Sequence, residues 1–180
     1  SIPDGAQSIT IGTDGVVSVQ LAGQTAPTQV GSVQLVDFIN TAGLLNKGAL
    51  QNQSPSDIAN QIHVNLTSAL WIAQAAYPSL KETKGMLLQF ASSSYTRGRA
   101  DYVAYSATKA AIVNLTQGLS EEWNDDEIRV NCIVPGRTDT EMRRANFNNE
   151  AQAGLCNPYE VALCAAKALS SRATGQVLRV

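Results

Sequence analysis

Beyond about residue 40, long helical patterns alternate with short apolar runs, and this alternation restricts the fold more than any other feature of the chain. One helix is expected over 56–80, because a Ser-Pro-Ser-Asp start at 54–57 offers an N-terminal cap. Compact apolar runs at 85–91 and 128–134 are typical of buried strands. Helices between successive strands predict a parallel sheet with right-handed crossovers.

Two more helices and two more strands complete the predicted α/β unit. Helical patterns cover 101–123 and 158–169, and the second begins at a proline suited to a first helical turn. A short strand at 176–180 and a strand before Asn40 bring the number of parallel strands to four. We therefore expect an α/β fold, a truncated Rossmann-like, doubly wound parallel sheet, with an N-terminal β-hairpin extension.

The hairpin is expected because the first 39 residues follow a different pattern. β-rich runs at 8–11 and 16–21 bracket Asp14-Gly15, a dipeptide that strongly favours a hairpin turn. Residues 23–27 are typical of a loop, and 30–39 alternate enough to be a third strand. The chain is thus divided into a β-rich segment at 1–39 and an α/β segment at 40–180.

The strand before Asn40 is expected to need a partner at its outer edge, because an uncovered apolar edge invites aggregation. The hairpin at 8–21 is the nearest segment that could fold back and pair with it antiparallel. This predicts a mixed sheet, antiparallel at its N-terminal edge and parallel elsewhere.

Charge and composition argue against several classes of function. A net charge of -2, without any run of Lys or Arg, gives no electrostatic reason to bind nucleic acid. No apolar run approaches the roughly 18 residues that span a bilayer, and the start lacks a signal-peptide pattern, so we expect a cytoplasmic protein without a membrane partner. Cys132, Cys156 and Cys164 lie in or near apolar runs and lack Cys-x-x-Cys spacing, which favours buried free thiols and no metal site.

Tyr105 and Lys109 stand four residues apart on the helix expected at 101–123, so their side chains share one face. An ammonium beside a phenol lowers the pKa of the phenol from about 10 toward working pH. Such a tyrosine can give or take a proton at a carbonyl or an alcohol. Taken alone, the pair is weak evidence, because Tyr and Lys at this spacing are common by chance.

Small and polar residues follow the predicted strands, at the sheet edge where open α/β folds bind ligands. Ser92 ends one strand and could hydrogen-bond the same substrate oxygen as Tyr105, although a serine triplet also fits a simple loop. Asn65 lies between Val64 and Leu66 within a helix, where a buried polar role is plausible. The other members of this set are Asn40, Ala42, Gly43, Pro135, Gly136 and Thr140.

In order and spacing, these residues resemble the short-chain dehydrogenase/reductase family over 40–180. The resemblance implies that Tyr105 is the general acid of carbonyl reduction and that Lys109 lowers its pKa and holds the nicotinamide ribose. It also implies that Ser92 orients the carbonyl and that Asn65 anchors a water in a proton relay. The implied cofactor is NAD or NADP, held by Asn40, Ala42, Gly43, Tyr105, Lys109, Pro135, Gly136, Thr138 and Thr140.

Within that family, residues 92–100, 105–109 and 137–143 are most similar to bacterial reductase domains that make ribitol 5-phosphate from ribulose 5-phosphate. This similarity implies a small sugar-phosphate substrate, reduced at its carbonyl. Arg97, Arg99 and Arg143 could hold the phosphate as bidentate donors, although each also fits a solvated loop. The family also commonly dimerises through the helices expected at 56–80 and 101–123, which implies a homodimer.

Residues 1–39 lack the Gly-rich turn and helix N-terminus that hold the cofactor pyrophosphate in complete family members. Weak cofactor binding is therefore expected. Residues 1–44 instead resemble flagellar distal-rod and hook proteins, through 10–19, 23–27 and 30–40. A chimera joined near Asn40 is one hypothesis, and two alternatives to a working reductase stay open: an inert, truncated or chimeric scaffold, and a flagellar rod fragment.

Overall fold

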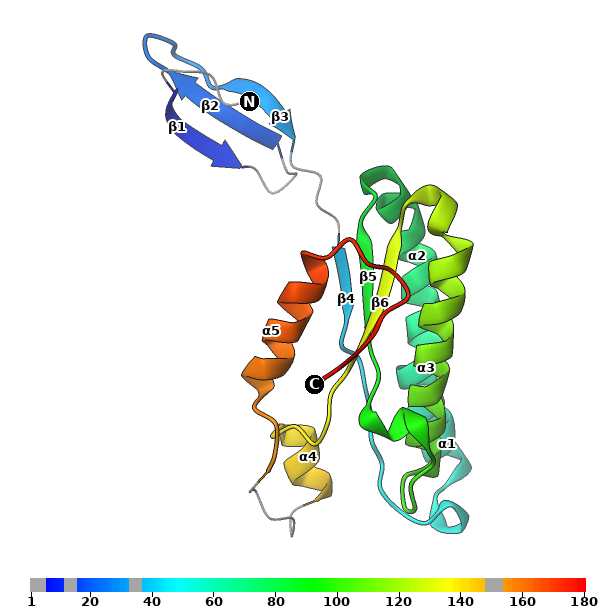
Figure 1. Ribbon diagram of the computed structural model, residues 1–180. Coiled ribbons are helices and arrows are strands. Elements are labelled where there is room, and N and C mark those ends of the chain that lie inside the picture. Colours follow the sequence, from blue (N-terminus) through cyan, green and yellow to red (C-terminus); the bar gives the residue numbers. More distant parts are fainter. Residues whose placement is uncertain (1–5, 12–15, 33–36, 148–153) are drawn as a thin grey trace. The chain divides into compact units, whose positions relative to one another are not determined.

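The computed structural model describes residues 6–11, 16–32, 37–147 and 154–180 of the chain (Figure 1). They belong to two compact units, one up to residue 36 and one from residue 37 onward. No helix among these residues is both long enough and apolar enough to cross a membrane.

The N-terminal unit is a three-stranded antiparallel sheet in the order β1-β2-β3. Its strands are β1 (Ala6–Ile11), β2 (Val16–Leu21) and β3 (Thr28–Ser32). The predicted pairing of the first two strands is confirmed, with Ile11 opposite Val17, and the Asp14-Gly15 turn lies outside the described residues. The predicted loop before β3 is also confirmed, since Gly23 has a φ of +82° and the Gln24 amide bonds the Leu21 carbonyl.

Two predictions for the strand before Asn40 are wrong. Residues 30–39 do not form one strand, because β3 ends at Ser32 and β4 (Asp37–Asn40) belongs to another sheet. The described strands also form no mixed sheet, since β1 to β3 pair among themselves and β4 to β7 pair separately. The physical reason is that β3 follows the hairpin closely in sequence, so pairing with β2 closes only a short loop.

The second unit contains a parallel sheet in the order β4-β5-β6-β7, which confirms the predicted α/β fold with four parallel strands. The strands after β4 are β5 (Met86–Phe90), β6 (Arg129–Val134) and β7 (Val177–Arg179). Phe38 lies opposite Leu87, and Leu87 lies opposite Val130. All of β6 after its first residue is buried, as expected for a strand covered on both faces.

Five α-helices accompany this sheet in the described part of the chain. They are α1 (Pro55–Ile62), α2 (Ser68–Thr83), α3 (Val103–Glu122), α4 (Glu141–Asn146) and α5 (Pro158–Leu169). Ser54 caps α1 by accepting from the Asp57 amide at 3.1 Å, as its sequence position predicts. The helix predicted over 56–80 is interrupted by a π-helical turn, His63–Thr67, and α4 was not predicted.

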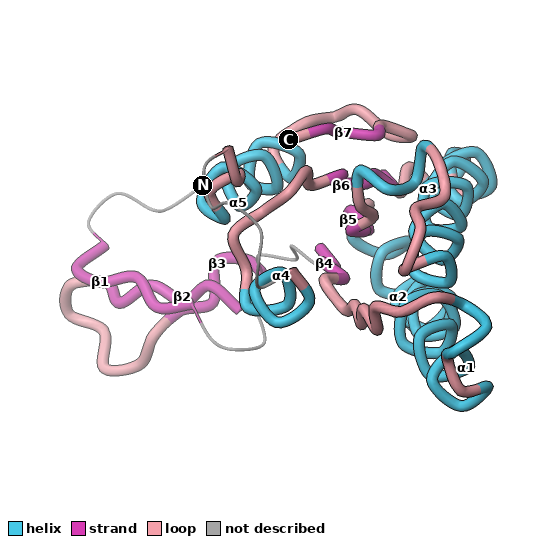
Figure 2. Tube along the Cα trace, turned by 90° about the horizontal axis from the view of Figure 1, so that it is seen from below, coloured by secondary structure: helices cyan, strands magenta, loops and turns pink. Residues whose placement is uncertain are grey.

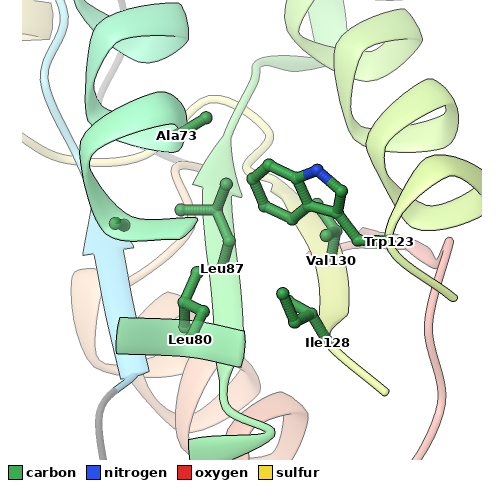
Figure 3. Packing of buried hydrophobic residues seen from close by; sticks show 7 residues of the cluster. Ala73, Leu80, Leu87, Trp123, Ile128 and Val130 are labelled. Atoms are coloured by element: carbon green, nitrogen blue, oxygen red, sulfur yellow. The ribbon is translucent and has the colours of Figure 1, made fainter. Parts of the chain in front are cut away.

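The helices cover the two faces of the sheet. Figures 1 and 2 show α2 and α3 on one face and α5 on the other. Leu87 packs under α2 and α3 with Ala73, Leu80, Trp123 and Val130 (Figure 3). The neighbouring residues Met86 and Leu88 point to the opposite face and contact residues of α5, so alternate residues of β5 serve two cores.

Cys132, Cys156 and Cys164 are free thiols, as predicted, but the expectation that all three are buried is wrong. Cys132 is buried in β6, and the other two are half-buried. Burial raises the pKa of the Cys132 thiol to about 11, so this thiol stays protonated at neutral pH.

Candidate active site

A cavity of about 510 Å³ opens at the carboxyl ends of β4, β5 and β6. It brings together most of the residues that the sequence predicts for the site. They are Gly43, Ser92, Tyr105, Lys109, Pro135, Gly136, Thr138 and Thr140. Asn40, Ala42 and Asn65 do not line the cavity, and of the three predicted phosphate-binding arginines Arg99 and Arg143 line it whereas Arg97 does not.

Tyr105 lies in the first turn of α3 and meets Ser92 at the end of β5. The interaction with Ser92 lowers the pKa of the Tyr105 phenol, as a nearby hydroxyl that can donate to the phenolate would. Ser92 also accepts from the Ser94 amide at 3.3 Å and faces the Ser94 hydroxyl at 3.2 Å, within the 3₁₀ turn Ser93–Thr96. These contacts fix the serine hydroxyl beside the phenol, where both can address one substrate oxygen.

Burial, more than any other influence, raises the pKa of the Tyr105 phenol, and the neighbouring Tyr102 raises it further. The interaction with Ser92 and the charge of Arg143 oppose that rise. Lys109 is not among the groups that lower this pKa, in contrast to what the family resemblance implies. Its ammonium nitrogen lies 5.8 Å from the centre of the Tyr105 ring.

Lys109 is itself 4 % exposed, and its ammonium donates to the Phe90 carbonyl at 2.9 Å. Burial lowers the pKa of the amine to about 8, with a partly opposing interaction from Cys132. A lysine with this pKa can exchange a proton near neutral pH, which an exposed lysine does poorly.

Asn65 lies in the π-helical turn and is 2 % exposed. Its amide oxygen accepts from the Leu44 amide at 2.7 Å, and its amide nitrogen donates to the Leu44 carbonyl at 2.9 Å. The same nitrogen donates to the Thr108 hydroxyl at 3.1 Å. Asn65 therefore joins the loop after β4 to the helix that carries Tyr105.

Asn40 shapes the turn at the end of β4. Its side chain donates to Gln89 on β5 at 2.9 Å and accepts from the Ala42 amide at 3.1 Å. The turn carries Gly43 past Lys109, since a Cβ on this glycine would lie 3.5 Å from the ammonium nitrogen. This side of the cavity is therefore formed by backbone and small side chains.

The end of β6 forms the opposite wall. The Gly136 amide donates to the Val180 carbonyl at 3.0 Å, and a Cβ at Gly136 would lie 3.2 Å from that oxygen. A glycine therefore fits here more easily than a larger residue. Thr140 caps α4 by accepting from the Arg143 amide at 3.3 Å, which sets the direction in which α4 leaves the strand end.

Several lining residues were not predicted from the sequence. Tyr102 precedes α3, Phe147 follows α4, and their rings meet edge to face with centres 5.8 Å apart. Met142, Arg137 and Leu45 also belong to this unpredicted part of the wall. Among these only Met142 and Arg137 carried a signal, since both lie in the stretch that resembles the sugar-phosphate reductases.

The lowered pKa of Lys109 predicts a pH-dependent stability. Between pH 8 and 10.5 the unfolded chain keeps a proton that the folded chain has released, so stability rises with pH across this window. Below it, the buried charge costs about 3 kcal/mol relative to the neutral amine. In urea unfolding at pH 7 and pH 10, the native protein should therefore gain stability relative to Lys109→Met at the higher pH. The same difference at both values would show that the amine is not desolvated.

Comparison with known proteins agrees with this geometry. A family model described as short chain dehydrogenase matches residues 10–151. A bifunctional ribulose 5-phosphate reductase/CDP-ribitol pyrophosphorylase of Haemophilus influenzae is 46% identical over 143 residues, which are 79% of this chain and 30% of that protein. A 3-oxoacyl-[acyl-carrier-protein] reductase of Chlamydia muridarum is 32% identical over 96% of this chain and 73% of its own length.

The solved structures give the same result. A short-chain dehydrogenase of Escherichia coli CFT073, complexed with NADPH, has a TM-score of 0.72 and 32% identity, over 79% of this chain and 61% of that one. None of these findings supports the flagellar resemblance of residues 1–44. The family match over most of the chain, together with the cavity that joins Ser92, Tyr105 and Lys109, shows that the chain belongs to the short-chain dehydrogenase/reductase family.

Proposed function

We propose that this chain is an NAD(P)H-dependent oxidoreductase that reduces the carbonyl of a small substrate, with a ketose phosphate as the favoured class. The observation that carries the proposal is the shared cavity, in which Tyr105, Ser92 and Lys109 face the same space as Arg99 and Arg143. It combines a proton donor and an oxygen-orienting hydroxyl with cations suited to a phosphate.

Tyr105 is the proposed proton donor to the carbonyl oxygen. Burial raises its pKa, so the phenol holds its proton at neutral pH, as a proton donor must. The Ser92 hydroxyl orients the carbonyl, and the same hydroxyl and the Arg143 charge stabilise the phenolate left after transfer. Lys109, whose pKa is about 8, returns a proton to Tyr105 through an intervening water or hydroxyl group.

The residues around Lys109 fit the nicotinamide end of a dinucleotide. An ammonium carries three N–H donors, and Lys109 uses one of them on Phe90, which leaves two for the hydroxyls of a ribose. Bound NADH or NADPH would supply the hydride. Asn40 would contribute through the turn that it shapes, and Asn65 is proposed to anchor a relay water. The residues proposed to hold the cofactor are Asn40, Ala42, Gly43, Tyr105, Lys109, Pro135, Gly136, Thr138 and Thr140.

A ketose phosphate is favoured by two independent observations. The Haemophilus relative, 46% identical, is a ribulose 5-phosphate reductase by name. Arg99 and Arg143 line the cavity with guanidinium groups, which match phosphate oxygens in bidentate pairs. Arg97 is outside the cavity lining and is not part of this proposal. The chimeric join and the flagellar character of residues 1–44 stay predictions that this reaction does not need.

Removing the Tyr105 hydroxyl should abolish reduction and leave the fold intact. With NADPH and ribulose 5-phosphate, we expect Tyr105→Phe to lower the rate by about 10²-fold to 10⁴-fold, the usual contribution of a general acid. Tyr159→Phe is the matched control, because Tyr159 is exposed on α5. Activity that survives unchanged in Tyr105→Phe, with an unaltered circular dichroism spectrum, would exclude this tyrosine as the proton donor.

The affinity for the cofactor should be low in this 180-residue chain, because residues 1–39 contain no Gly-rich turn for the pyrophosphate. The nicotinamide-side contacts alone should give dissociation constants at or above 1 mM, or at most about 4 kcal/mol of binding free energy. Fluorescence titration of NADH and NADPH measures this. A micromolar constant would mean that the pyrophosphate is held by residues other than those proposed, and complete absence of binding would favour the inert scaffold.

The helices at 56–80 and 101–123 are further proposed to form a homodimer. Large apolar side chains are exposed on α1, α2 and α3, namely Ile62, Leu70, Trp71 and Val103. Trp71 is 58% exposed, so Trp71→Glu should shift the chain from dimer to monomer at micromolar concentration in analytical ultracentrifugation. Leu163→Glu, on α5, should leave the dimer unchanged. A native chain that sediments only as a monomer would refute the proposal.

A further inference from the structure

Two cationic side chains from distant parts of the chain lie against the ring of Phe147. The Lys47 ammonium is 4.7 Å from the ring centre, and the Arg143 guanidinium carbon is 4.6 Å from it. Phe147 and Arg143 both line the cavity that contains Tyr105. Lys47 is not among the residues that line the cavity, so its contact with Phe147 is what places its ammonium beside the cavity wall.

The backbone on both sides of Lys47 is fixed by hydrogen bonds. The Asn46 amide donates to the Gln61 side chain at 3.1 Å, and the Asn46 carbonyl accepts from Gln53 at 3.2 Å. The Gly48 carbonyl accepts from the same Gln53 amide nitrogen at 2.8 Å, and the Gly48 amide donates to the Asp101 carbonyl at 2.6 Å. Every backbone polar group of the two residues that flank Lys47 thus has a partner.

These partners tie Lys47 to α3. Gln61 is fully buried in α1 and also donates to Gln53 at 3.3 Å, which links the two glutamines. Asp101, whose φ is +65°, stands immediately before Tyr102 and the start of α3. The position from which the Lys47 side chain extends is therefore set relative to Tyr105, although the side chain itself is exposed.

The local chemistry favours an anion beside the Phe147 ring. Lys47 makes no salt bridge with any residue in the described ranges, and an aromatic ring carries no net charge to neutralise the ammonium. Lys47 and Arg143 both bring positive charge to the Phe147 ring. A dianionic phosphate interacts favourably with both charges at once.

We propose that Lys47 and Arg143 form the subsite for the phosphate group of the substrate. The two residues are far apart in sequence but contact the same Phe147 ring, and Lys47 is the specificity-determining residue. This inference rests on the proposed reduction of a ketose phosphate and adds a residue to it. The subsite distinguishes a phosphorylated ketose from the same ketose without phosphate.

The subsite is tested by binding, which needs no turnover. Ribulose 5-phosphate and ribulose are titrated into the full 180-residue chain and followed by the chemical shifts of backbone amides. Lys47→Gln should weaken ribulose 5-phosphate binding about tenfold, equivalent to about 1.4 kcal/mol, and should leave ribulose unaffected. Lys47→Arg should restore most of the affinity. Lys167→Gln, the same change on an exposed residue of α5, should have no effect.

Three results would overturn the subsite. They are equal affinity of the native chain and Lys47→Gln for the phosphate ester, an equal loss for ribulose, and no phosphate-dependent binding by the native chain. The proposed reaction fails separately. If no NADPH is consumed but Lys47→Gln binds ribulose 5-phosphate tenfold more weakly, the subsite stands and the proposed reaction fails. If reduction occurs but Lys47→Gln binds ribulose 5-phosphate as tightly as the native chain, only the subsite fails.

Discussion

The candidate site depends most on the hydrogen bonds of the buried Asn65 side-chain amide. It holds the backbone of Leu44 through both its oxygen and its nitrogen, and it also bonds Thr108 on α3. A buried polar group that loses its partners costs about 1–3 kcal/mol, so this side chain, the loop and the helix fix one another's positions. Tyr105, Lys109 and Gly43 are positioned by the elements that Asn65 joins.

The pKa values of the ionisable groups in the site are shifted more by burial than by neighbouring charges. Tyr105 and Lys109 are both desolvated, which raises the pKa of the phenol and lowers that of the amine. Each group therefore favours its neutral form more than it would in water. With a pKa of about 8 the Lys109 amine is still mostly charged at neutral pH, so it can return a proton to a Tyr105 phenolate, a transfer that leaves both groups neutral. The cation that lowers the Tyr105 pKa is Arg143, which belongs to the wall of the cavity and not to α3.

The sequence predicted the parallel sheet and the Tyr105-Lys109 pair because both depend on local patterns. Hydrophobic periodicity identifies buried strands and long helices, and a spacing of four puts two side chains on one helical face. The six-residue α4 and the ring of Phe147 gave no such signal, because a short helix has no readable period. The contacts of Lys47 and Arg143 with the ring of Phe147 depend on tertiary packing that no local pattern encodes. The sheet to which β4 belongs could not be predicted either, because an alternating run does not show which strand it pairs with.

The π-helical turn, His63–Thr67, determines what the deletion of a residue would do in this part of the chain. The Ser68 amide reaches back to the His63 carbonyl, so this turn holds one residue more than an α-helical turn would. Deleting a single residue there would convert the turn to ordinary α-helix and leave the alanine face of α2 on the sheet. It would also move Asn65 away from Leu44. The length of this one turn thus sets where Asn65 lies relative to Leu44.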